Sequence, residues 1–175
     1  MGILGKLFHG GVTTDAVELL TAQHEEVDVL LERLEKGDGN RRELFMQLAN
    51  NLAAHATIEE KIFYPAVMAK DTNELLQESV EEHLAIKRVL ADLITMKLDN
   101  DAFKAKLSVL AEQVSHHAHK EEEDKLFPEV KKLFSADERA ALGGEMLAMF
   151  EDLMAGAPAM DVPGETEVAA PLPRA

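Results

Sequence analysis

Two segments of the sequence repeat one arrangement of chemically active side chains. Residues 55–65 read HATIEEKIFYP and residues 119–128 read HKEEEDKLFP. Each has a His, a Glu four residues later, a Phe four residues after that, and a Pro close behind. On an α-helix, residues four apart share one face and lie about 6 Å apart along the axis. The repeat therefore predicts two metal-binding motifs, His55 with Glu59 and His119 with Glu123.

Two further histidines, His24 and His83, fall near the middle of two other predicted helices. In an antiparallel bundle the middles of the helices lie at one level, so four imidazoles would meet in the interior. Buried ring nitrogens without partners are costly, and a metal satisfies several at once. Four nitrogens and two carboxylates would crowd one metal. Two metals sharing both carboxylates would leave room for an oxo, hydroxo, water or small exogenous ligand.

Imidazole and carboxylate ligands suit iron, and also manganese or zinc. We therefore expect a dinuclear centre that holds iron, manganese or zinc ions. The predicted ligands are His24, His55, Glu59, His83, His119 and Glu123.

The elements that must position these ligands are four long helices and one shorter one. Capping-box patterns mark four helix starts, because a small polar residue precedes a Glu by three positions. These pairs are Asp15 with Glu18, Asn40 with Glu43, Asp71 with Glu74, and Ser135 with Glu138. The expected helices span residues 15–36, 40–69, 71–98, 100–134 and 135–154.

Short connections between these helices predict antiparallel neighbours. The fold class is therefore all-α, an up-down-up-down four-helix bundle with an additional short C-terminal helix. We expect a flexible N-terminus over residues 1–12, the bundle over 13–154 and a disordered Pro/Ala-rich tail over 155–175. A local kink is expected at Pro65 and at Pro128, because proline lacks an N–H and crowds the preceding turn.

Several residues beside the motifs have more than one interpretation. Phe63 and Phe127 continue the ligand face and could form an apolar floor. Tyr64 is either a packed amphipathic residue or a redox or proton-donating group beside the site. His116 lies one turn before His119 and is either a fifth nitrogen ligand or a hydrogen-bonding neighbour. The remaining candidates are assigned to the surface or to solvated charge runs: His9, Glu60, His117, Glu122 and Asp124.

Composition excludes several classes of function. The net charge of −15 would be repelled by a nucleic acid or an anionic membrane, so neither is an expected partner. The sequence contains no Cys, which excludes disulfides, thiolate metal sites and thiol catalysis. No apolar run approaches the ~20 residues of a membrane helix, and the first residues make a poor signal peptide. We therefore expect a cytoplasmic protein.

The spaced set of His24, His55-x3-Glu59, His83 and His119-x3-Glu123 resembles the hemerythrin-like, or HHE cation-binding, domains. The resemblance covers about residues 15–134 and includes the FYP and FP endings of the two motifs. It implies a four-helix bundle with a non-haem di-iron site. It further implies that His24 and His55 hold one iron, that His83 and His119 hold the other, and that Glu59 and Glu123 bridge them.

The sequence also departs from the oxygen-carrying members of that family. Those members have a second His on the third helix and an Asp five residues after the His of the last helix. Here the third helix offers Ser79 and Lys87 at those positions, and the last carboxylate follows its His by four residues. The resemblance therefore points toward iron sensing, peroxide decomposition or repair of iron centres. Repair members carry a Cys-containing N-terminal segment, which has no counterpart in a sequence without Cys.

Two functions from different classes follow as expectations. One is a di-iron protein that binds or senses oxygen, nitric oxide, peroxide or iron. The other is a catalase-like enzyme that decomposes hydrogen peroxide. Ferritin-like di-iron enzymes are excluded, because they use a Glu-x-x-His motif that does not occur in this sequence.

Overall fold

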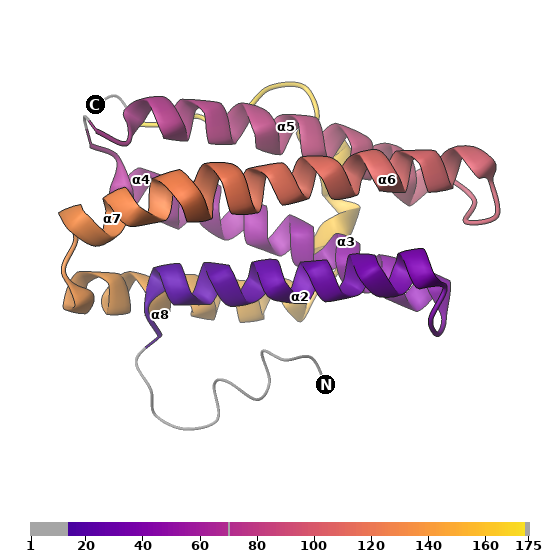
Figure 1. The fold of residues 1–175 in the computed structure, drawn as a ribbon, viewed down its shortest axis with the longest axis horizontal. Helices are drawn as coiled ribbons and strands as arrows, with labels where there is room; N and C mark the ends of the chain where they lie inside the picture. The colour runs from indigo at the N-terminus through magenta and orange to yellow at the C-terminus, as the bar shows by residue number, and fades with distance from the viewer. Residues whose placement is uncertain (1–13, 70, 174–175) are drawn as a thin grey trace.

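The computed structural model describes residues 14–69 and 71–173, and these residues form helices and connections without a β-strand. Four long helical segments, called rods below, run antiparallel, and the helix α8 lies beside the first of them (Figure 1). The first rod is α2 and the third is α5. The second rod is made of α3, η1 and α4 end to end, and the fourth of α6, η2 and α7. The elements are α2 (Ala16–Lys36), α3 (Arg41–Ile58), η1 (Glu59–Phe63), α4 (Tyr64–Val67), α5 (Asn73–Thr95), α6 (Asp101–Ser115), η2 (His116–Leu126), α7 (Phe127–Leu133) and α8 (Ala136–Met154). The predicted bundle is confirmed, and the expectations for residues 1–12, including His9, lie outside the described residues.

Side-chain caps explain most of the helix starts. Asn40 accepts from the backbone N–H groups of Arg42 and Glu43 at the start of α3. Ser135 and Glu138 form the full reciprocal capping box of α8. Asp71 does not cap α5 as predicted, because Thr72 takes the N-cap position and its hydroxyl bonds back to the preceding turn. The chain between α4 and α5 is held by that hydroxyl instead.

Two segments of the bundle are π-helices, in which each N–H bonds to the carbonyl five residues earlier. The Tyr64 N–H reaches the Glu59 carbonyl at the end of η1, and the Phe127 N–H reaches the Glu122 carbonyl at the end of η2. Each segment ends shortly before a proline, Pro65 or Pro128. The distortion expected at the prolines is therefore a widened helical turn on their N-terminal side.

The core is divided into two hydrophobic clusters along the bundle. One cluster contains Leu30, Leu48, Leu90 and Phe103, and the other contains Leu20, Phe63, Leu76 and Val130. The histidines of the predicted site belong to neither cluster. They occupy the level between the two, where His24, His55 and His83 are buried and His119 is partly exposed.

The fifth helix, α8, packs against α2 and α3. Arg139 on α8 donates from Nε to the Oδ2 atom of Asp15, the residue that caps α2, over 2.7 Å. Gly143 permits the close approach, because a Cβ there would lie 1.9 Å from the Thr14 carbonyl oxygen. The additional helix is thus a packed part of the bundle.

The C-terminal segment is not the disordered tail that its composition predicts. Pro158–Met160 and Val162–Glu165 form two 3₁₀ turns, η3 and η4. Ala159 and Val162 are buried in the first core cluster, and Arg88 on α5 donates to the carbonyls of Thr166 and Glu167. Two apolar anchors and these hydrogen bonds hold the segment against α3 and α5, where Figure 1 shows it in yellow.

Among the described residues, no helix is long and apolar enough to cross a membrane.

Candidate metal centre

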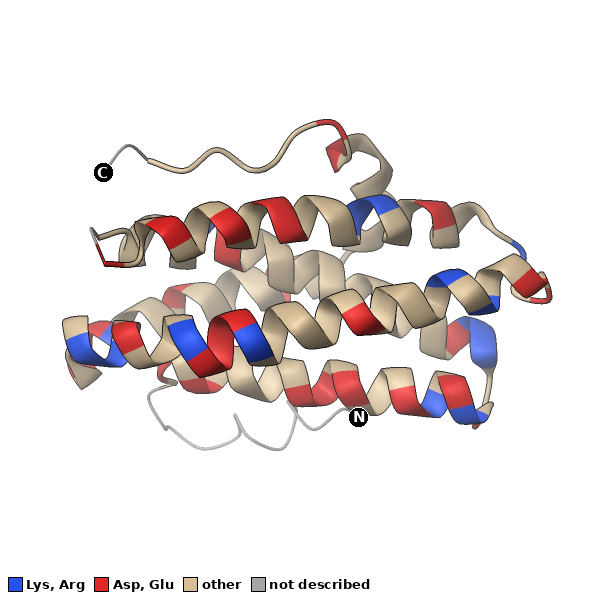
Figure 2. Cartoon of the chain, turned by 45° about the horizontal axis from the view of Figure 1, so that its top comes forward, with Lys and Arg blue, Asp and Glu red and all other residues tan. Residues whose placement is uncertain are grey.

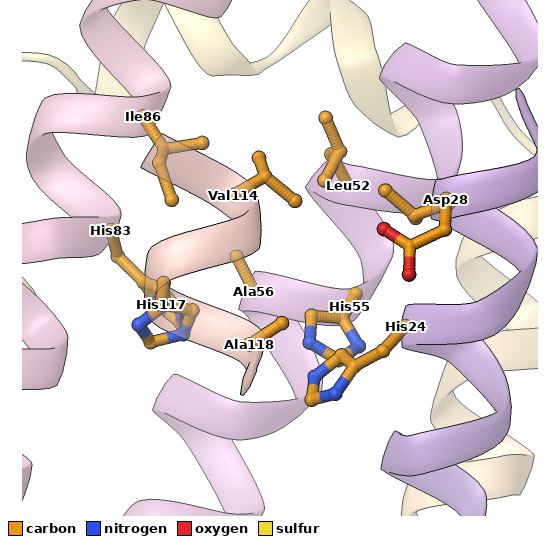
Figure 3. A pocket seen from close by; sticks show the side chains of 11 residues that line it. His24, Asp28, Leu52, His55, Ala56, His83, Ile86, Val114, His117 and Ala118 are labelled. Carbon is orange, nitrogen blue, oxygen red and sulfur yellow. Dashed lines mark hydrogen bonds between the residues drawn. The ribbon is translucent and has the colours of Figure 1, made fainter. Parts of the chain in front are cut away.

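Four imidazoles from the four rods of the bundle converge at the level between the core clusters. They are His24 on α2, His55 on α3, His83 on α5 and His117 on η2, and all four are buried. The rings of His24 and His55 lie 5.0 Å apart, and those of His83 and His117 lie 4.5 Å apart. The imidazoles therefore form two pairs, which Figure 3 shows side by side.

Two buried carboxylates connect these pairs. Glu59 Oε2 lies 3.1 Å from His55 Nε2 and 3.2 Å from His83 Nε2. Glu122 Oε2 lies 3.1 Å from His24 Nε2 and 3.7 Å from His117 Nε2. Each carboxylate thus spans one His of each pair, as a ligand bridging two metal ions would.

The donor atoms fall into two groups that could each hold a metal ion. The first comprises His24, His55, Glu59 and Glu122, and the second comprises Glu59, His83 and His117. Within each group, ligand atoms from all members lie within 4.8 Å of one another. Glu59 belongs to both groups, so the arrangement suits two metal ions better than one.

The structure brings together only four of the six predicted ligands: His24, His55, Glu59 and His83. On the last rod, His117 and Glu122 take the positions that the sequence assigned to His119 and Glu123. The reason is the π-helical turn of η2, in which residues five apart share a face. The prediction used the four-residue spacing of an α-helix and so selected a pair that lies outside the two donor groups.

His119 and Glu123 lie outside the cluster of buried donors. His119 is partly exposed, with Nε2 3.0 Å from Asp28 Oδ2 and Nδ1 3.0 Å from Glu123 Oε2. Glu123 in turn lies 2.7 Å from the Nδ1 atom of His24. Glu123 therefore contacts the Nδ1 side of the His24 ring, and both residues lie away from the centre of the donor cluster.

A signal in the sequence could have identified His117 and Glu122. Glu59 lies six residues before Pro65, and Glu122 lies six residues before Pro128. The dipeptide His-Ala occurs at residues 55–56 and again at 117–118. Aligned in this way, the second motif has one extra residue between His and Glu, which is the residue that a π-turn accommodates.

Each of the four imidazoles has a polar partner on its Nδ1 atom, which leaves Nε2 facing the centre. Glu123 lies 2.7 Å from His24, Gln23 2.7 Å from His55, Glu60 3.0 Å from His83 and Glu82 2.7 Å from His117, all measured from the side-chain oxygen to Nδ1. Such partners fix the tautomer and the ring orientation of a metal-binding His and increase its basicity. All four rings are therefore oriented for ligation through Nε2.

Glu60 is another residue that the sequence assigned to a solvated charge run. It is largely buried, accepts from Lys87 over 2.8 Å and pairs with His83. Lys87 also contacts Glu165 of the C-terminal segment over 2.8 Å. The segment beyond α8 is thereby connected to the His83 side of the site through charged side chains.

Tyr64 lies fully buried beside the second group of donors. Its hydroxyl donates to Glu122 Oε1 over 2.9 Å and is 3.2 Å from the Nε2 atom of His83. Burial, together with the charges of Glu122 and Glu59, raises the pKa of this phenol well above its usual value. Tyr64 therefore holds its proton at neutral pH, next to the carboxylate of Glu122.

The remaining neighbours of the donors are two phenylalanines packed beside His24 and one histidine at the surface. Phe127 stacks on His24 with ring centroids 5.9 Å apart, and Phe63 meets Phe127 edge to face. His116 is mostly exposed, and its Nε2 atom lies 3.3 Å from Glu82. It contacts a partner of His117 and is not a member of either donor group.

Without a metal, neighbouring carboxylates favour the charged form of two imidazoles, those of His24 and His83. Burial opposes the charged form of His24, but its contacts with Glu122 and Glu123 outweigh this and raise its pKa to about 10. Burial likewise opposes protonation of His83, whose contacts with Glu59 and Glu60 raise its pKa to about 10. The pKa of Glu123 is lowered to about 2, first by its hydrogen bond from His24.

Several buried polar atoms at the centre are not satisfied by hydrogen bonds. Among the described residues, both carboxylate oxygens of Glu59, Oε2 of Glu122 and Nε2 of His24 are buried without a hydrogen-bond partner. Their close contacts lack hydrogen-bonding geometry. Unsatisfied buried oxygens are expensive, and metal ions directed at these lone pairs would satisfy them. The donor set therefore fits a dinuclear metal centre.

A small cavity of about 30 Å³ lies directly beside the donors. Figure 3 shows its apolar walls, which include Leu52, Ile86 and Val114. All four imidazoles also line it. A space of about 10–15 Å³ holds one water on this scale, so the cavity has room for a molecule of two or three atoms.

Fold and site together define a helical bundle whose buried His and Glu side chains could hold metal ions. The hemerythrin HHE cation-binding domain matches residues 15–130, and the chain belongs to that family. The resemblance noted from the sequence is confirmed. Membership in this family supports a metal-binding function for the centre.

Two known proteins resemble the chain over most of its length. A hemerythrin HHE cation-binding domain-containing protein from Mycobacterium kansasii superposes with a TM-score of 0.70 at 22% identity, covering 81% of this chain and 88% of that protein. That likeness supports the fold. A DNA nickase of Nostoc sp. (strain PCC 7120 / SAG 25.82 / UTEX 2576) is 27% identical over 123 residues, which are 69% of this chain and 35% of the nickase. The chain thus matches about a third of that relative's length.

Proposed function

We propose that the chain binds two iron ions and that the di-iron centre binds a small molecule such as oxygen, nitric oxide or peroxide. The observation that carries the proposal is the pair of buried donor groups that share Glu59 and open onto an apolar cavity. The proposed ligands are His24, His55, His83 and His117, with Glu59 and Glu122 as bridges. Manganese or zinc would fit the same donor types.

Bound iron would supply a redox-active centre with an affinity for small ligands. The protein's own side chains hold and surround that centre. Glu60, Glu82, Glu123 and Gln23 orient the four imidazoles through Nδ1. The apolar residues of the cavity exclude bulk water from the ligand's position.

A second candidate function is the decomposition of hydrogen peroxide, in which two peroxide molecules yield two waters and one oxygen. Tyr64 favours this candidate, because its hydroxyl donates a hydrogen bond to Glu122, a proposed bridging carboxylate, and lies 3.2 Å from His83 of the second donor group. The phenol could donate a proton to the peroxide that is reduced to water and recover one from the second peroxide, which loses two protons when it is oxidised to oxygen.

We do not extend the nicking activity of the Nostoc relative to this chain. The chain corresponds to about a third of that protein. In addition, its net charge is −15, and Figure 2 shows acidic residues at many positions along the helices. Such a surface repels a DNA backbone. Our proposed partner therefore remains a small molecule, with neither nucleic acid nor membrane involved.

The first experiment is elemental analysis of the full chain after expression with ample iron. About two irons per chain are expected, and a single metal per chain would contradict the dinuclear assignment. Addition of oxygen or nitric oxide to the reduced protein should then change its visible spectrum reversibly. Sustained oxygen release from peroxide would favour the enzyme, whereas a spectral change without turnover would favour the carrier or sensor.

A further inference from the structure

Among the described residues that line the cavity beside the donors, one is exposed to solvent. Of the eleven side chains that line it, ten are buried, and only Asp28 is exposed, with 46% of its side chain accessible. Asp28 lies on α2, one turn beyond His24. Figure 3 shows its carboxylate at the α2 side of the cavity. A small molecule that passes from solvent to the donors must therefore move past Asp28, or through close-packed side chains.

The Asp28 carboxylate is held in that position by His119 on η2. The His119 Nε2 atom lies 3.0 Å from Asp28 Oδ2, and this contact closes the seam between α2 and η2. On the outside, His119 lines a surface groove together with Glu35, Glu112 and Lys120. Asp28 lines the inner cavity and His119 lines the outer groove, so their contact is the partition between the two.

We propose that the Asp28–His119 pair is the entrance of the ligand cavity and that it selects neutral small molecules over anions. This inference rests on the proposed function, because it names the class of ligand that reaches the proposed di-iron centre. Opening requires only the rotation of two partly exposed side chains, since neither contact residue belongs to a core cluster.

The charges along the route give the selectivity. An anion would pass the carboxylates of Glu35 and Glu112, the ammonium group of Lys120 and the imidazoles of His116 and His119 before it met Asp28. It would then enter a cavity with apolar walls, where the loss of hydration is costly. Oxygen, nitric oxide and hydrogen peroxide carry no charge and avoid both penalties. Azide and similar anions incur both.

The test measures association rates in three variants of the iron-loaded full chain. Asp28→Asn removes the charge at nearly constant size, and Asp28→Ala removes the partition. Glu32→Gln is the matched control, because Glu32 lies one turn further along α2, is mostly exposed and does not line the cavity. Stopped-flow mixing gives the rate for azide with the oxidised protein and for nitric oxide with the reduced protein.

In Asp28→Asn we expect azide to bind about fivefold faster, the effect of removing one nearby charge, with little change for nitric oxide. In Asp28→Ala both ligands should bind severalfold faster. Added salt should accelerate azide binding to the wild type more than to Asp28→Asn, because salt screens the repulsion. Unchanged rates in both Asp28 variants, or equal acceleration in Glu32→Gln, would overturn the proposal.

A second measurement separates failure of the entrance from failure of the proposed function. In the zinc-loaded chain, dissolved oxygen is paramagnetic and should broaden the methyl NMR signals of Leu52, Ile86 and Val114, which line the cavity. Exchange into the cavity should be faster in Asp28→Ala. If the iron-loaded protein binds no ligand but this broadening occurs, the entrance stands and the di-iron function fails. If the broadening is the same in the wild type and in Asp28→Ala, the entrance assignment fails.

Discussion

His117 and Glu122 are five residues apart, and they face the same centre from one turn of the helix. Their Nε2 and Oε2 atoms lie 3.7 Å apart, and Glu122 Oε2 lies 3.1 Å from His24. The π-helical turn of η2 produces this alignment, since an α-helix would place the fifth residue on a different face. The local backbone therefore determines which of several adjacent His and Glu side chains could bind metal.

The first prediction follows from this alignment. Replacing His117 with Ala removes a proposed ligand, so the chain should retain about one metal ion or fewer after purification and dialysis. His119→Ala is the matched control two residues away, and it should retain nearly the full complement. Metal per chain by elemental analysis checks both. Equal loss in the two variants would refute the assignment of His117 over His119.

A companion pair tests the carboxylates. Glu122→Gln should lower metal occupancy strongly, because a bridging oxygen with negative charge is lost. Glu123→Gln should have a smaller effect, about tenfold or more in affinity, since Glu123 supports His24 through Nδ1 without facing the centre. A larger loss of bound metal in Glu123→Gln than in Glu122→Gln would contradict this assignment. It would support Glu123, four residues after His119, as the ligand.

The bundle could be predicted from the sequence because the signals that start and pattern each helix are local. Caps such as Asn40 and Ser135, a 3.6-residue apolar period and short connections act within one or two turns. His24, His55, Glu59 and His83 were also found, since they lie where regular α-helical spacing holds up to the ligand. His117 and Glu122 were missed because the π-turn breaks that spacing. The packing of residues 158–167 was missed because Ala159, Val162 and Arg88 form tertiary contacts without a local pattern.

Metal affinity should increase with pH. In the metal-free chain, the pKa values of His24 and His83 are raised to about 10, so both imidazoles are doubly protonated and charged at neutral pH. A metal can bind their Nε2 atoms only after those protons leave. Release of two protons predicts an affinity increase of about hundredfold per pH unit between pH 6 and pH 8. Competition of zinc with a chelator at several pH values measures the slope, and circular dichroism confirms that the chain stays folded. A flat profile would contradict ligation by these two imidazoles.

The contact between α8 and the start of α2 can be tested with two adjacent glycines. A Cβ on Gly143 would lie 1.9 Å from the Thr14 carbonyl and 2.8 Å from the Ala16 nitrogen, so Gly143→Ala must displace backbone. We expect it to lower the free energy of unfolding by about 1–3 kcal/mol. Gly144→Ala has no atom within 4 Å of the new Cβ and should raise stability by about 0.5–1 kcal/mol through helix propensity. Urea unfolding of the metal-free chain measures both. The same change in both variants would contradict close packing of α8 at Gly143.

Tyr64→Phe separates the two candidate functions. The change keeps the buried ring in place but removes the hydroxyl that donates to Glu122 Oε1. The bridging carboxylate loses its hydrogen-bond donor, so metal affinity should fall by about tenfold or somewhat more. If Tyr64 is a proton donor, oxygen release from peroxide should decline much further than this loss of metal explains, while the association rate of nitric oxide stays nearly constant. Both activities should be normalised to bound iron. Equal effects on peroxide turnover and nitric oxide binding would assign Tyr64 a purely supporting role and favour the carrier or sensor over the enzyme.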